Sequence, residues 1–596
     1  MASIPNVTKP TNFCSNPSSA CTFNNNQKLH LFPPPSFNSK IHHFKVSCKS
    51  TNDDRGNKLS GGGRLDRREL LFGLTGLYST TAALTADRKA LGLPIQAPDL
   101  SACGPPADVP STVGPTDCCP PNSSKIVDFK LPARSSPLRV RPAAHRVDAE
   151  YLAKYTEAIA KMKALPADDP RNFTQQANVH CAYCDGAYDQ VGFPDLELQI
   201  HNSWLFFPWH RFYLYFNERI LGKLIGDDSF ALPFWNWDAP DGMQLPSIYA
   251  DPSSPLYDKL RDAKHQPPYL IDLDFNGQDP TFSKEEQIDH NLKIMYRQVV
   301  SNGKTTELFM GSPYRAGDQP DPGQGSLESV PHGPVHIWTG DRNQPNREDM
   351  GTFYSAGRDP IFFAHHGNVD RMWYLWKNKV GGRRRRDFED KDWLNTSFLF
   401  YDENAQLVRV KVRDCLDTEA MRYTYQDVDI PWLSTKPTPQ RAMLKTKKKA
   451  SLLQQKAKAE ATFPLTLTKP ASATVARPRV ARRGEEKEAE EEVLVVEGIQ
   501  LDKGDFVKFD VYINAPDHEG VGPGATEFAG SFVHVPHKHS KGKSEKKKMM
   551  MKTVLRLGIT DLLDDIGADD DDSVIVTLVP RSGEGVVIGG IRIVLS

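Results

Sequence analysis

Closely spaced histidines in the middle of the chain could bind a metal ion. His332 and His336 in "PHGPVHIW" stand four positions apart, so on a helix both imidazoles project from one face. Pro334 lies between them, and a helix tolerates proline only in its first turn, so we expect these histidines where a helix begins. Further on, "DPIFFAHHGNVDRMWYLW" places His365 and His366 near the start of another helix with an apolar stripe. A helical pair and a histidine from a neighbouring helix would give three imidazole ligands for one metal.

A second set of histidines lies upstream. His201 and His210 occur in "QIHNSWLFFPWHRFY", and His210 follows Pro208, where a helical period begins. His180, in "VHCAYC", is the third candidate. A single histidine of this kind is more often an ordinary core or surface residue, but two sets of three indicate metal binding. Because no carboxylate is interspersed, the sets favour copper or zinc, which prefer imidazole, over magnesium or manganese.

Composition divides the chain that must position these residues. Residues 97–435 are rich in aromatic residues with helical periodicity, which predicts a large, mainly α-helical unit. Residues 436–490 contain charge runs with few large apolar residues, which is typical of an exposed, protease-sensitive linker. In residues 491–596, β-branched runs alternate with Gly, Asp and Pro turns and predict a small β-sandwich or barrel.

Three histidines in the β part form a further cluster, His534, His537 and His539. Their composition is that of a metal-binding tract. They lie among predicted strands and beside a lysine run, however, so we expect a solvated turn there.

The N-terminal residues 1–96 are predicted to be a targeting segment. Residues 1–52 contain no Asp or Glu and are rich in Ser, Asn and Pro, which is typical of an organelle transit peptide, with a disordered tail as the alternative. Arg67 and Arg68 then precede an apolar run that is short for a membrane span. We therefore expect a chloroplast transit peptide followed by a twin-arginine signal for the thylakoid lumen, and no membrane-spanning segment in the mature chain.

The charge balance excludes some partners. The 596 residues carry a formal net charge of -1, with a pI near 7.0. No global field therefore attracts nucleic acid or an anionic membrane, and partners must be argued from local features.

Removal of the targeting segment would leave six cysteines, Cys103, Cys118, Cys119, Cys181, Cys184 and Cys415. A lumenal address permits disulfides. The neighbours Cys118 and Cys119 cannot bond to each other without severe strain, and Cys103 and Cys181 are available partners. For "VHCAYC", a zinc knuckle, a disulfide corner and half of another site all remain open.

Taken together, the motifs resemble those of plant polyphenol oxidases, which belong to the catechol oxidase and tyrosinase superfamily of type 3 dicopper enzymes. The resemblance rests on "VHCAYC", "HNSWLFFPWHRFYLYF", "LPFWNWD", "GSLESVPHGPVHIW", "DMGTFYSAGRDPIFFAHHGNVDRMW", "DWLNTSFLFYDENAQLVRVKV" and "KFDVYI", and it covers nearly the whole chain. It implies a mainly α fold in which a four-helix-bundle dicopper core with loop-rich surroundings precedes a C-terminal β-sandwich or jelly-roll-like domain.

The resemblance also implies roles for individual residues. One copper ion would be held by His180, His201 and His210, and the second by His332, His336 and His366, with His365 as a neighbour that is not a ligand. Cys184 would form a thioether with His201, with a free buried thiol as the alternative, and disulfides would join Cys103 to Cys119 and Cys118 to Cys181. A thioether would tie down one imidazole and prevent Cys184 from acting as a soft thiolate ligand.

Five residues near the ligands match further family positions. Glu328 would orient a water near the metals and assist deprotonation of the substrate, although a carboxylate at a helix N-terminus is the alternative. Phe353 would lie over the first copper ion, with an ordinary core phenylalanine as the alternative. Asn368 and Asp370 are expected to hydrogen-bond or charge-pair with ligand imidazoles. Gly333 has no side chain to help hold a water or deprotonate a monophenol, which favours diphenol oxidation.

The implied reaction is the oxidation of o-diphenols to o-quinones while O2 is reduced to water. The β domain is expected to shield the active site until a protease cleaves the linker. A monophenol-hydroxylating tyrosinase, or a specialised phenol hydroxylase on the same scaffold, is the alternative. An oxygen carrier is disfavoured because such proteins would not need a plastid address. The oligomeric state is not determined by these features.

Overall fold

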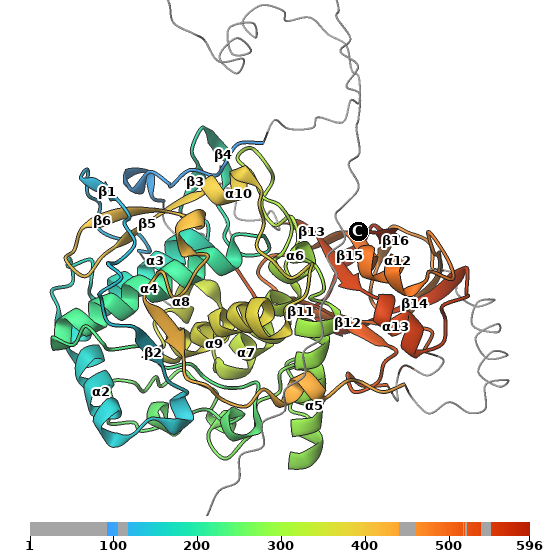
Figure 1. The fold of residues 1–596 in the computed structure, drawn as a ribbon, viewed down its shortest axis with the longest axis horizontal. Helices are drawn as coiled ribbons and strands as arrows, with labels where there is room; N and C mark the ends of the chain where they lie inside the picture. Colours follow the sequence, from blue (N-terminus) through green and yellow to red (C-terminus); the bar gives the residue numbers. More distant parts are fainter. Residues whose placement is uncertain (1–91, 105–116, 440–460, 516–517, 519–520, 538–549) are drawn as a thin grey trace, which may run out of the picture. The chain divides into compact units, whose positions relative to one another are not determined.

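A helical domain and a β domain make up the described part of the chain. The computed structural model describes residues 92–104, 117–439, 461–515, 518, 521–537 and 550–596. These residues belong to one unit, Lys89–Ser596. In Figure 1 the helical domain runs from blue through green and yellow to light orange, and the β domain from deeper orange to red. The predicted targeting segment lies almost entirely outside the described residues.

Local sequence signals set the ends of the helices that carry histidines. Helix α3 (Phe173–Cys184) begins after Asn172, whose side chain accepts a hydrogen bond from the Thr174 N–H. Helix α4 (Phe206–Ile225) ends at Gly226, which has a φ of 69°, a left-handed conformation that suits glycine. Helix α7 (Gly333–Thr339) has Pro334 in its first turn, as the sequence predicts. The other helices of this domain are α2 (Ala149–Ala164), α5 (Lys284–Tyr296), α6 (Thr306–Met310), α8 (Phe353–Ala356), α9 (Ile361–Leu375) and α10 (Lys391–Asn395).

Short strands tie distant parts of the helical domain together. A three-stranded sheet has the order β1-β6-β5, in which β1 and β6 are parallel. Two pairs complete the set, β2 with β7 and β3 with β4. The bounds are β1 (Ile126–Asp128), β2 (Arg139–Arg141), β3 (Asp189–Gln190), β4 (Phe193–Glu197), β5 (Ser397–Tyr401), β6 (Leu407–Lys411) and β7 (Tyr423–Tyr425).

Aromatic side chains fill the core of the helical domain. All nine tryptophans of the chain are fully buried, each below 2% exposed. On the core side of α4, Phe207 stacks on Phe309 with ring centroids 4.9 Å apart, and Phe309 stacks on Trp376 at 4.3 Å. Burying one large apolar side chain stabilises a fold by about 1.5–3 kcal/mol. The helices that carry the histidines are therefore held on a rigid scaffold.

The β domain is a two-sheet sandwich, as predicted. One sheet has the order β13-β10-β15-β8 with β16 also paired to β10, and the other has the order β12-β11-β14-β9. A separate hydrophobic cluster, which includes Leu494, Val496, Phe509 and Val511, lies in this domain. The bounds are β8 (Leu465–Thr466), β9 (Ala471–Ala476), β10 (Glu492–Asp502), β11 (Val507–Ile513), β12 (Phe528–His534), β13 (Met550–Gly558), β14 (Ser573–Ser582), β15 (Val587–Ile588) and β16 (Gly590–Leu595), with the short helices α12 (Gly484–Ala489) and α13 (Thr560–Asp565).

The β domain begins earlier in the chain than its charge pattern suggests. Residues 461–490, which we expected to belong to the exposed linker, contain β8, β9 and α12, and β9 pairs with β14. Two arginines of this charged segment form buried ion pairs, which stabilise it in the fold. Nη2 of Arg477 and Nη2 of Arg482 lie 2.9 and 3.1 Å from Oε2 of Glu492. Of the expected linker, residues 440–460 lie outside the described residues.

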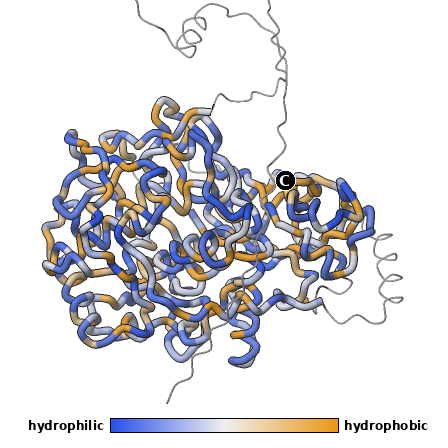
Figure 2. The backbone as a smooth tube through the Cα atoms, viewed as in Figure 1, coloured by the Kyte–Doolittle hydropathy of each residue, from blue (hydrophilic) through white to orange (hydrophobic). Residues whose placement is uncertain are grey.

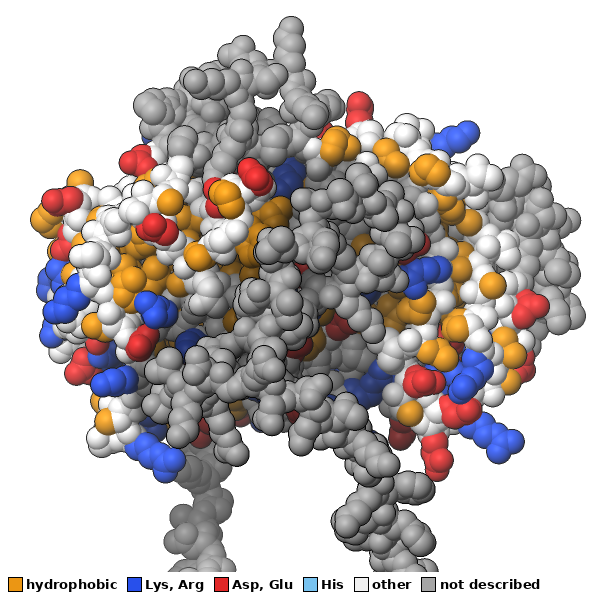
Figure 3. Space-filling model, turned by 90° about the horizontal axis from the view of Figure 1, so that it is seen from above, with side chains coloured by type: hydrophobic (Ala, Val, Ile, Leu, Met, Phe, Trp, Pro, Cys, Tyr) orange, Lys and Arg blue, Asp and Glu red, His pale blue; other side chains and the backbone are white. Residues whose placement is uncertain are grey.

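The described surface carries charges of both signs, in agreement with the net charge of -1. Helix α5, at the lower edge of the view, is mostly hydrophilic (Figure 2). On the face drawn in Figure 3, acidic and basic side chains lie close to one another on both sides of the molecule, and neither sign forms a large patch of its own. No helix in the described part of the chain combines the length and the apolar composition needed to cross a membrane.

Candidate metal centre and active site

Four helices and two adjoining segments bring the predicted histidines together. The histidines come from α3 (His180), the loop before α4 (His201), α4 (His210), the turn before α7 (His332), α7 (His336) and α9 (His365, His366). They form two buried groups whose possible ligand atoms lie within 4.8 Å of one another: His180, Cys184, His201 and His210 in one, and His332, His336, His365 and His366 in the other. The two sets recognised in the sequence are thus two clusters in space.

Main-chain carbonyl groups orient four of the imidazoles. The Nδ1 atoms lie 2.7–3.1 Å from carbonyl oxygens, in the pairs His180 with Phe353, His210 with Phe206, His332 with Glu328 and His336 with Met350. A carbonyl oxygen only accepts, so in each pair Nδ1 carries the proton and the Nε2 lone pair is left free. This is the arrangement that prepares a histidine for metal binding.

The Nε2 atoms turn toward shared space. Among the described residues, Nε2 of His180, His210 and His332 is buried without a hydrogen-bond partner. Nε2 of His336 lies 3.3 Å from Nε2 of His366. Buried polar atoms are normally paired, so convergent lone pairs of this kind indicate sites for positive ions.

The two groups adjoin each other. The rings of His210 and His366 stack with centroids 4.2 Å apart, and those of His201 and His332 are 5.8 Å apart. Each of these contacts joins one group to the other. The arrangement therefore suits a pair of neighbouring metal ions.

His365 differs from its neighbours in the partner of its Nδ1 atom. The indole N–H of Trp237 donates to this atom, at 3.2 Å. A neutral His365 must then carry its proton on Nε2, so it offers no lone pair from that atom. Its surroundings distinguish it from His366, the next residue on α9.

Burial keeps these histidines neutral. Loss of solvent lowers the pKa of His210 to about 3 and that of His336 to about 4. The same cause lowers the pKa of His180, His201 and His366 well below the ordinary value. Neutral imidazole is the form that binds a metal, so the apolar surroundings hold the ligands ready.

Phe353 and Glu328 border the clusters. The ring of Phe353 stacks on that of His201 with centroids 3.9 Å apart. Oε1 of Glu328 accepts the Asn202 N–H at 2.6 Å, while Oε2 is buried without a partner among the described residues. Burial raises the pKa of Glu328 well above the ordinary value.

Asn368 and Asp370 do not take the partners expected from the sequence. The Asn368 amide donates to Asp238 at 2.9 Å. Asp370 pairs with Arg211 at 2.5 Å and Arg141 at 3.0 Å. The expectation that they contact ligand imidazoles is therefore wrong: both lie on α9, but they point into buried polar networks that brace this helix against the rest of the domain.

The cysteines fall into two classes. Disulfides join Cys103 to Cys119 and Cys118 to Cys181, the pairing that the resemblance implies. Cys184 and Cys415 are buried free thiols. Burial raises the pKa of the Cys184 thiol well above its ordinary value, so it is neutral beside the first histidine group.

Comparison with known proteins accounts for this arrangement. The common central domain of tyrosinase matches residues 170–379, the polyphenol oxidase middle domain residues 387–438, and the chloroplastic polyphenol oxidase C-terminal domain residues 463–595. A chloroplastic polyphenol oxidase of Malus domestica is 59% identical over 99% of both chains. The chain belongs to the plant polyphenol oxidase family.

Two further relatives also match most of this chain. The solved structure of latent apple tyrosinase is 62% identical, covers 79% of this chain and 100% of its own, and has a TM-score of 0.74. Aureusidin synthase of Antirrhinum majus is 51% identical over 94% of this chain and 99% of its own. The start of the C-terminal family match, residue 463, agrees with the start of the β domain near β8.

The two histidine groups of this polyphenol oxidase fit a dicopper centre. Each group offers at least three neutral, buried imidazoles, and neither contains a carboxylate. Imidazole ligation of this kind suits copper. The structure thus supports the cofactor that the sequence predicts.

The β domain contacts residues that border this centre. His537 stacks on Phe353 with ring centroids 4.9 Å apart, on a ring that in turn stacks on His201. His534 and His537 are each 2% exposed. The expectation of a solvated turn is therefore wrong for these two residues, because the end of β12 packs against the helical domain; His539 lies outside the described residues.

Side chains of the helical domain donate to the main chain at the end of β12 and just beyond it. The Gln324 side chain donates to the Val533 carbonyl at 2.8 Å, and the Thr352 hydroxyl donates to the Pro536 carbonyl at 3.1 Å. A Cβ atom at Gly333 would lie only 2.9 Å from Cγ1 of Val533. The absence of a side chain at position 333 thus lets the strand sit directly over the start of α7.

The sequence did not indicate the groups that orient the ligands. The carbonyl groups of Phe206, Met350 and Phe353 act through the main chain, which leaves no residue-type signal. Trp237 lies in the motif "LPFWNWD", but the sequence does not show that its indole N–H donates to His365 and so sets that histidine apart from the ligands.

Proposed function

We propose that this polyphenol oxidase oxidises o-diphenols to o-quinones with reduction of O2 to water. The observation that carries the proposal is the convergence of buried, neutral imidazoles in two adjoining groups. The ligands of the two copper ions would be His180, His201 and His210 for one, and His332, His336 and His366 for the other. His365 is left out because its Nδ1 accepts from Trp237.

The protein's own groups would bind and orient the substrate. Copper, when bound, would supply the exchange of electrons between the diphenol and dioxygen. Phe353 holds the His201 ring by stacking and gives an apolar surface beside the centre. Oε2 of Glu328, on the turn before His332, is a carboxylate oxygen without a hydrogen-bond partner among the described residues, so it would accept a proton from the diphenol hydroxyl. Its pKa is raised by burial, and the positive charge of occupied metal sites would lower it again.

A thioether between Cys184 and His201 would fix the one proposed ligand imidazole whose two ring nitrogens both have no hydrogen-bond partner among the described residues. Both residues lie in the same group. The bond would form with loss of two hydrogen atoms, from the thiol and the ring, to dioxygen, the oxidant of the proposed reaction, which would be reduced to hydrogen peroxide. It would do for His201 what main-chain carbonyl groups do for His180 and His210.

Gly333 favours diphenol oxidation over hydroxylation of monophenols. It follows His332 and offers no polar atom to hold a water near the centre. Hydroxylation on the same scaffold is the alternative, since this chain is also 51% identical to a (+)-larreatricin hydroxylase of Larrea tridentata. Comparison of initial rates on catechol and on tyramine, with the lag phase recorded, separates the two.

The chain would be latent until the β domain is removed. Val533, Val535 and His537 stand over Gly333 and Phe353, which borders the metal centre. Cleavage by a protease is proposed within residues 440–460, the part of the expected linker that precedes the sandwich. A chloroplast location is supported by the relatives named chloroplastic, and the twin arginines before the apolar run support the thylakoid lumen.

The test compares the intact chain with a chain that ends at residue 439, at equal copper content. Two copper ions per chain, and diphenol oxidation that rises on removal of the β domain, are expected. A single copper ion per chain would refute the paired site. Equal rates in the two forms would refute latency while leaving the oxidase proposal in place.

A further inference from the structure

Asn202, in the loop before α4, is held by hydrogen bonds through both its backbone and its side chain. It follows His201 in the chain and has a φ of 57°, a left-handed conformation that asparagine tolerates better than most residues. Its N–H donates to Oε1 of Glu328 at 2.6 Å, its carbonyl oxygen accepts the N–H of Gly323 at 2.9 Å, and its side-chain amide donates to Oδ1 of Asp321 at 3.0 Å. The position of this residue is therefore fixed from two sides.

These bonds connect the two histidine groups. Asn202 is next to His201 of the first group, and the carbonyl oxygen of Glu328 accepts from Nδ1 of His332, in the second group, at 3.1 Å. The ring nitrogens of His201 have no hydrogen-bond partner among the described residues, so apart from stacking its direction depends on the main chain on either side. On the other side, Oε1 of Gln199 accepts the N–H of His201 at 3.0 Å. A shift of Asn202 would thus move His201 and disturb the Glu328 carboxylate at the same time.

Asp321 anchors the side chain of Asn202 from a short segment of the helical domain. It is buried, lies between Pro320 and Pro322, and has a φ of 65°. A left-handed residue other than glycine is uncommon and persists only where the surrounding structure holds it, and the fixed φ of proline makes the segment stiffer. A hydrogen bond to an ionised carboxylate is also stronger than one between neutral groups. The contact between Asp321 and Asn202 is therefore a firm one.

We propose that Asp321 is a positioning residue for the oxidation of diphenols: through the Asn202 amide it sets the direction of His201 and of the Glu328 carboxylate at the metal centre. The inference rests on the proposed function for the reaction itself. Asp321 belongs to neither histidine group, so its effect on them would pass through Asn202. Groups that hold a metal ligand in place typically contribute about 10–100-fold to metal affinity or activity.

The other oxygen of the same carboxylate contacts the β domain. Nζ of Lys503, which is buried, lies 3.1 Å from Oδ2 of Asp321 and 3.6 Å from Oε2 of Glu197. Removing the charge of Asp321 alone would weaken this buried ion pair and could loosen the β domain, which would confuse docking with positioning. The test therefore uses chains in which Lys503→Gln removes the opposite charge as well.

Two intact, copper-loaded chains that both carry Lys503→Gln give the decisive comparison. One also carries Asp321→Asn, which keeps an acceptor oxygen for the Asn202 amide, and the other carries Asp321→Gly, which removes it. Asparagine and glycine both adopt a positive φ readily, so neither substitution strains the backbone at position 321. The readouts are the rate at which copper is lost to a chelator, and kcat and KM for catechol at full copper content.

The chain with Asp321→Gly should lose its more labile copper ion about tenfold faster than the chain with Asp321→Asn. Its kcat should be about tenfold lower, with KM changed by less than about twofold, because the acceptor orients groups at the centre and does not bind the substrate. A merely structural role would instead lower the melting temperature of the copper-free chain and leave kcat unchanged. Adding Asn202→Gly removes the donor, so the two chains should then behave alike.

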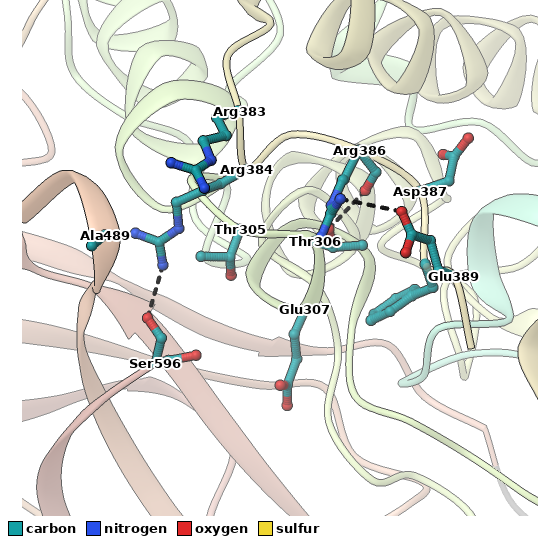
Figure 4. A pocket seen from close by; sticks show the side chains of 11 residues that line it. Thr305, Thr306, Glu307, Arg383, Arg384, Arg386, Asp387, Glu389, Ala489 and Ser596 are labelled. Atoms are coloured by element: carbon teal, nitrogen blue, oxygen red, sulfur yellow. Dashed lines mark hydrogen bonds and ion pairs between the residues drawn. The ribbon is translucent and has the colours of Figure 1, made fainter. Parts of the chain in front are cut away.

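Arg384→Gln is the control for looser docking of the β domain. In the cavity of about 500 Å³ that Figure 4 shows, Arg384 donates to a main-chain oxygen of Ser596 at 2.8 Å, so it contacts the β domain at a place that does not involve Asn202. Copper loss from this variant should equal that from the parent chain.

Equal copper loss and equal kcat from the chains with Asp321→Asn and Asp321→Gly would overturn the proposal. The same loss of copper from Arg384→Gln as from the chain with Asp321→Gly would assign the effect to docking and would also overturn it. If no chain, including the parent, oxidised catechol, the proposed function would fail, and the rates of copper loss would still decide for or against the role of Asp321.

Discussion

Replacing Gly333 by alanine should loosen the β domain without harming the helical domain. Gly333 has helical torsion angles, φ -58° and ψ -52°, so alanine fits its backbone. In the chain that ends at residue 439, alanine should therefore be neutral or stabilise α7 by up to about 1 kcal/mol. In the intact chain the new Cβ would lie 2.9 Å from Cγ1 of Val533 and 3.4 Å from Cγ2 of Val535.

The size of the effect follows from that overlap. Val533 is 2% exposed and sits on β12, so it cannot move aside freely. Overpacking of this kind destabilises by about 1–3 kcal/mol. We expect this destabilisation to act on the packing of the β domain against the helical domain. The equilibrium between chains in which the β domain is docked and chains in which it is undocked then shifts by about five- to 150-fold, since 1.4 kcal/mol is a factor of ten.

The assay is the ratio of diphenol oxidation by the intact chain to that by the shortened chain, at equal copper content. The ratio cancels any direct effect of position 333 on catalysis. Gly333→Ala should raise it. Val533→Ala removes the methyl group that clashes, so in the double variant the effect of Gly333→Ala on the ratio should largely disappear. An unchanged ratio in the single variant, or the same effect with and without Val533→Ala, would show that β12 does not press on α7 as described.

Three other results are expected. Peptide mapping should recover a crosslinked peptide in which Cys184 of α3 is joined to His201 in the loop before α4. The variant Cys184→Ala should give the two peptides separately. Separate peptides from the parent chain would disprove the thioether. Burial lowers the pKa of His210 to about 3 and of His336 to about 4, below the unfolded value of about 6.5, so the unfolded chain binds more protons as the pH falls. Stability of the copper-free chain should therefore be lost as the pH falls below about 6.5, which denaturant melts at several pH values would detect, and a flat profile would contradict it. Glu492→Gln leaves Arg477 and Arg482 without their buried charged partner, so it should destabilise the β domain by about 3–5 kcal/mol in denaturant melts. The control Glu490→Gln, at an exposed ion pair, should change stability by less than about 1 kcal/mol. Equal effects of the two substitutions would refute a structural role for the buried network.

The sequence predicted the histidine clusters because their spacing is a local property. The four-residue interval between His332 and His336, with Pro334 in the first turn, determines one face of α7 whatever surrounds it. The β-branched runs likewise predicted a sandwich, because alternation along a strand reports burial on one face.

The errors concern contacts between residues far apart in the chain. Asp370 on α9 meets Arg141, more than two hundred positions away, and no local pattern reports that pairing. His537 looked solvated beside a lysine run, yet it stacks on Phe353 of the other domain. Residues 461–490 looked like linker because the charge run needs Glu492 and the pairing of β9 with β14 to fold.

The carbonyl groups that hold Nδ1 of His180, His210, His332 and His336 belong to the backbone of helices and turns. A substitution changes a side chain but leaves the peptide carbonyl where the helix puts it. The direction of these ligands is therefore insensitive to mutation at the residues that supply the carbonyl groups. Side chains around the centre can therefore vary in shape and polarity while the orientation of these four imidazoles is kept.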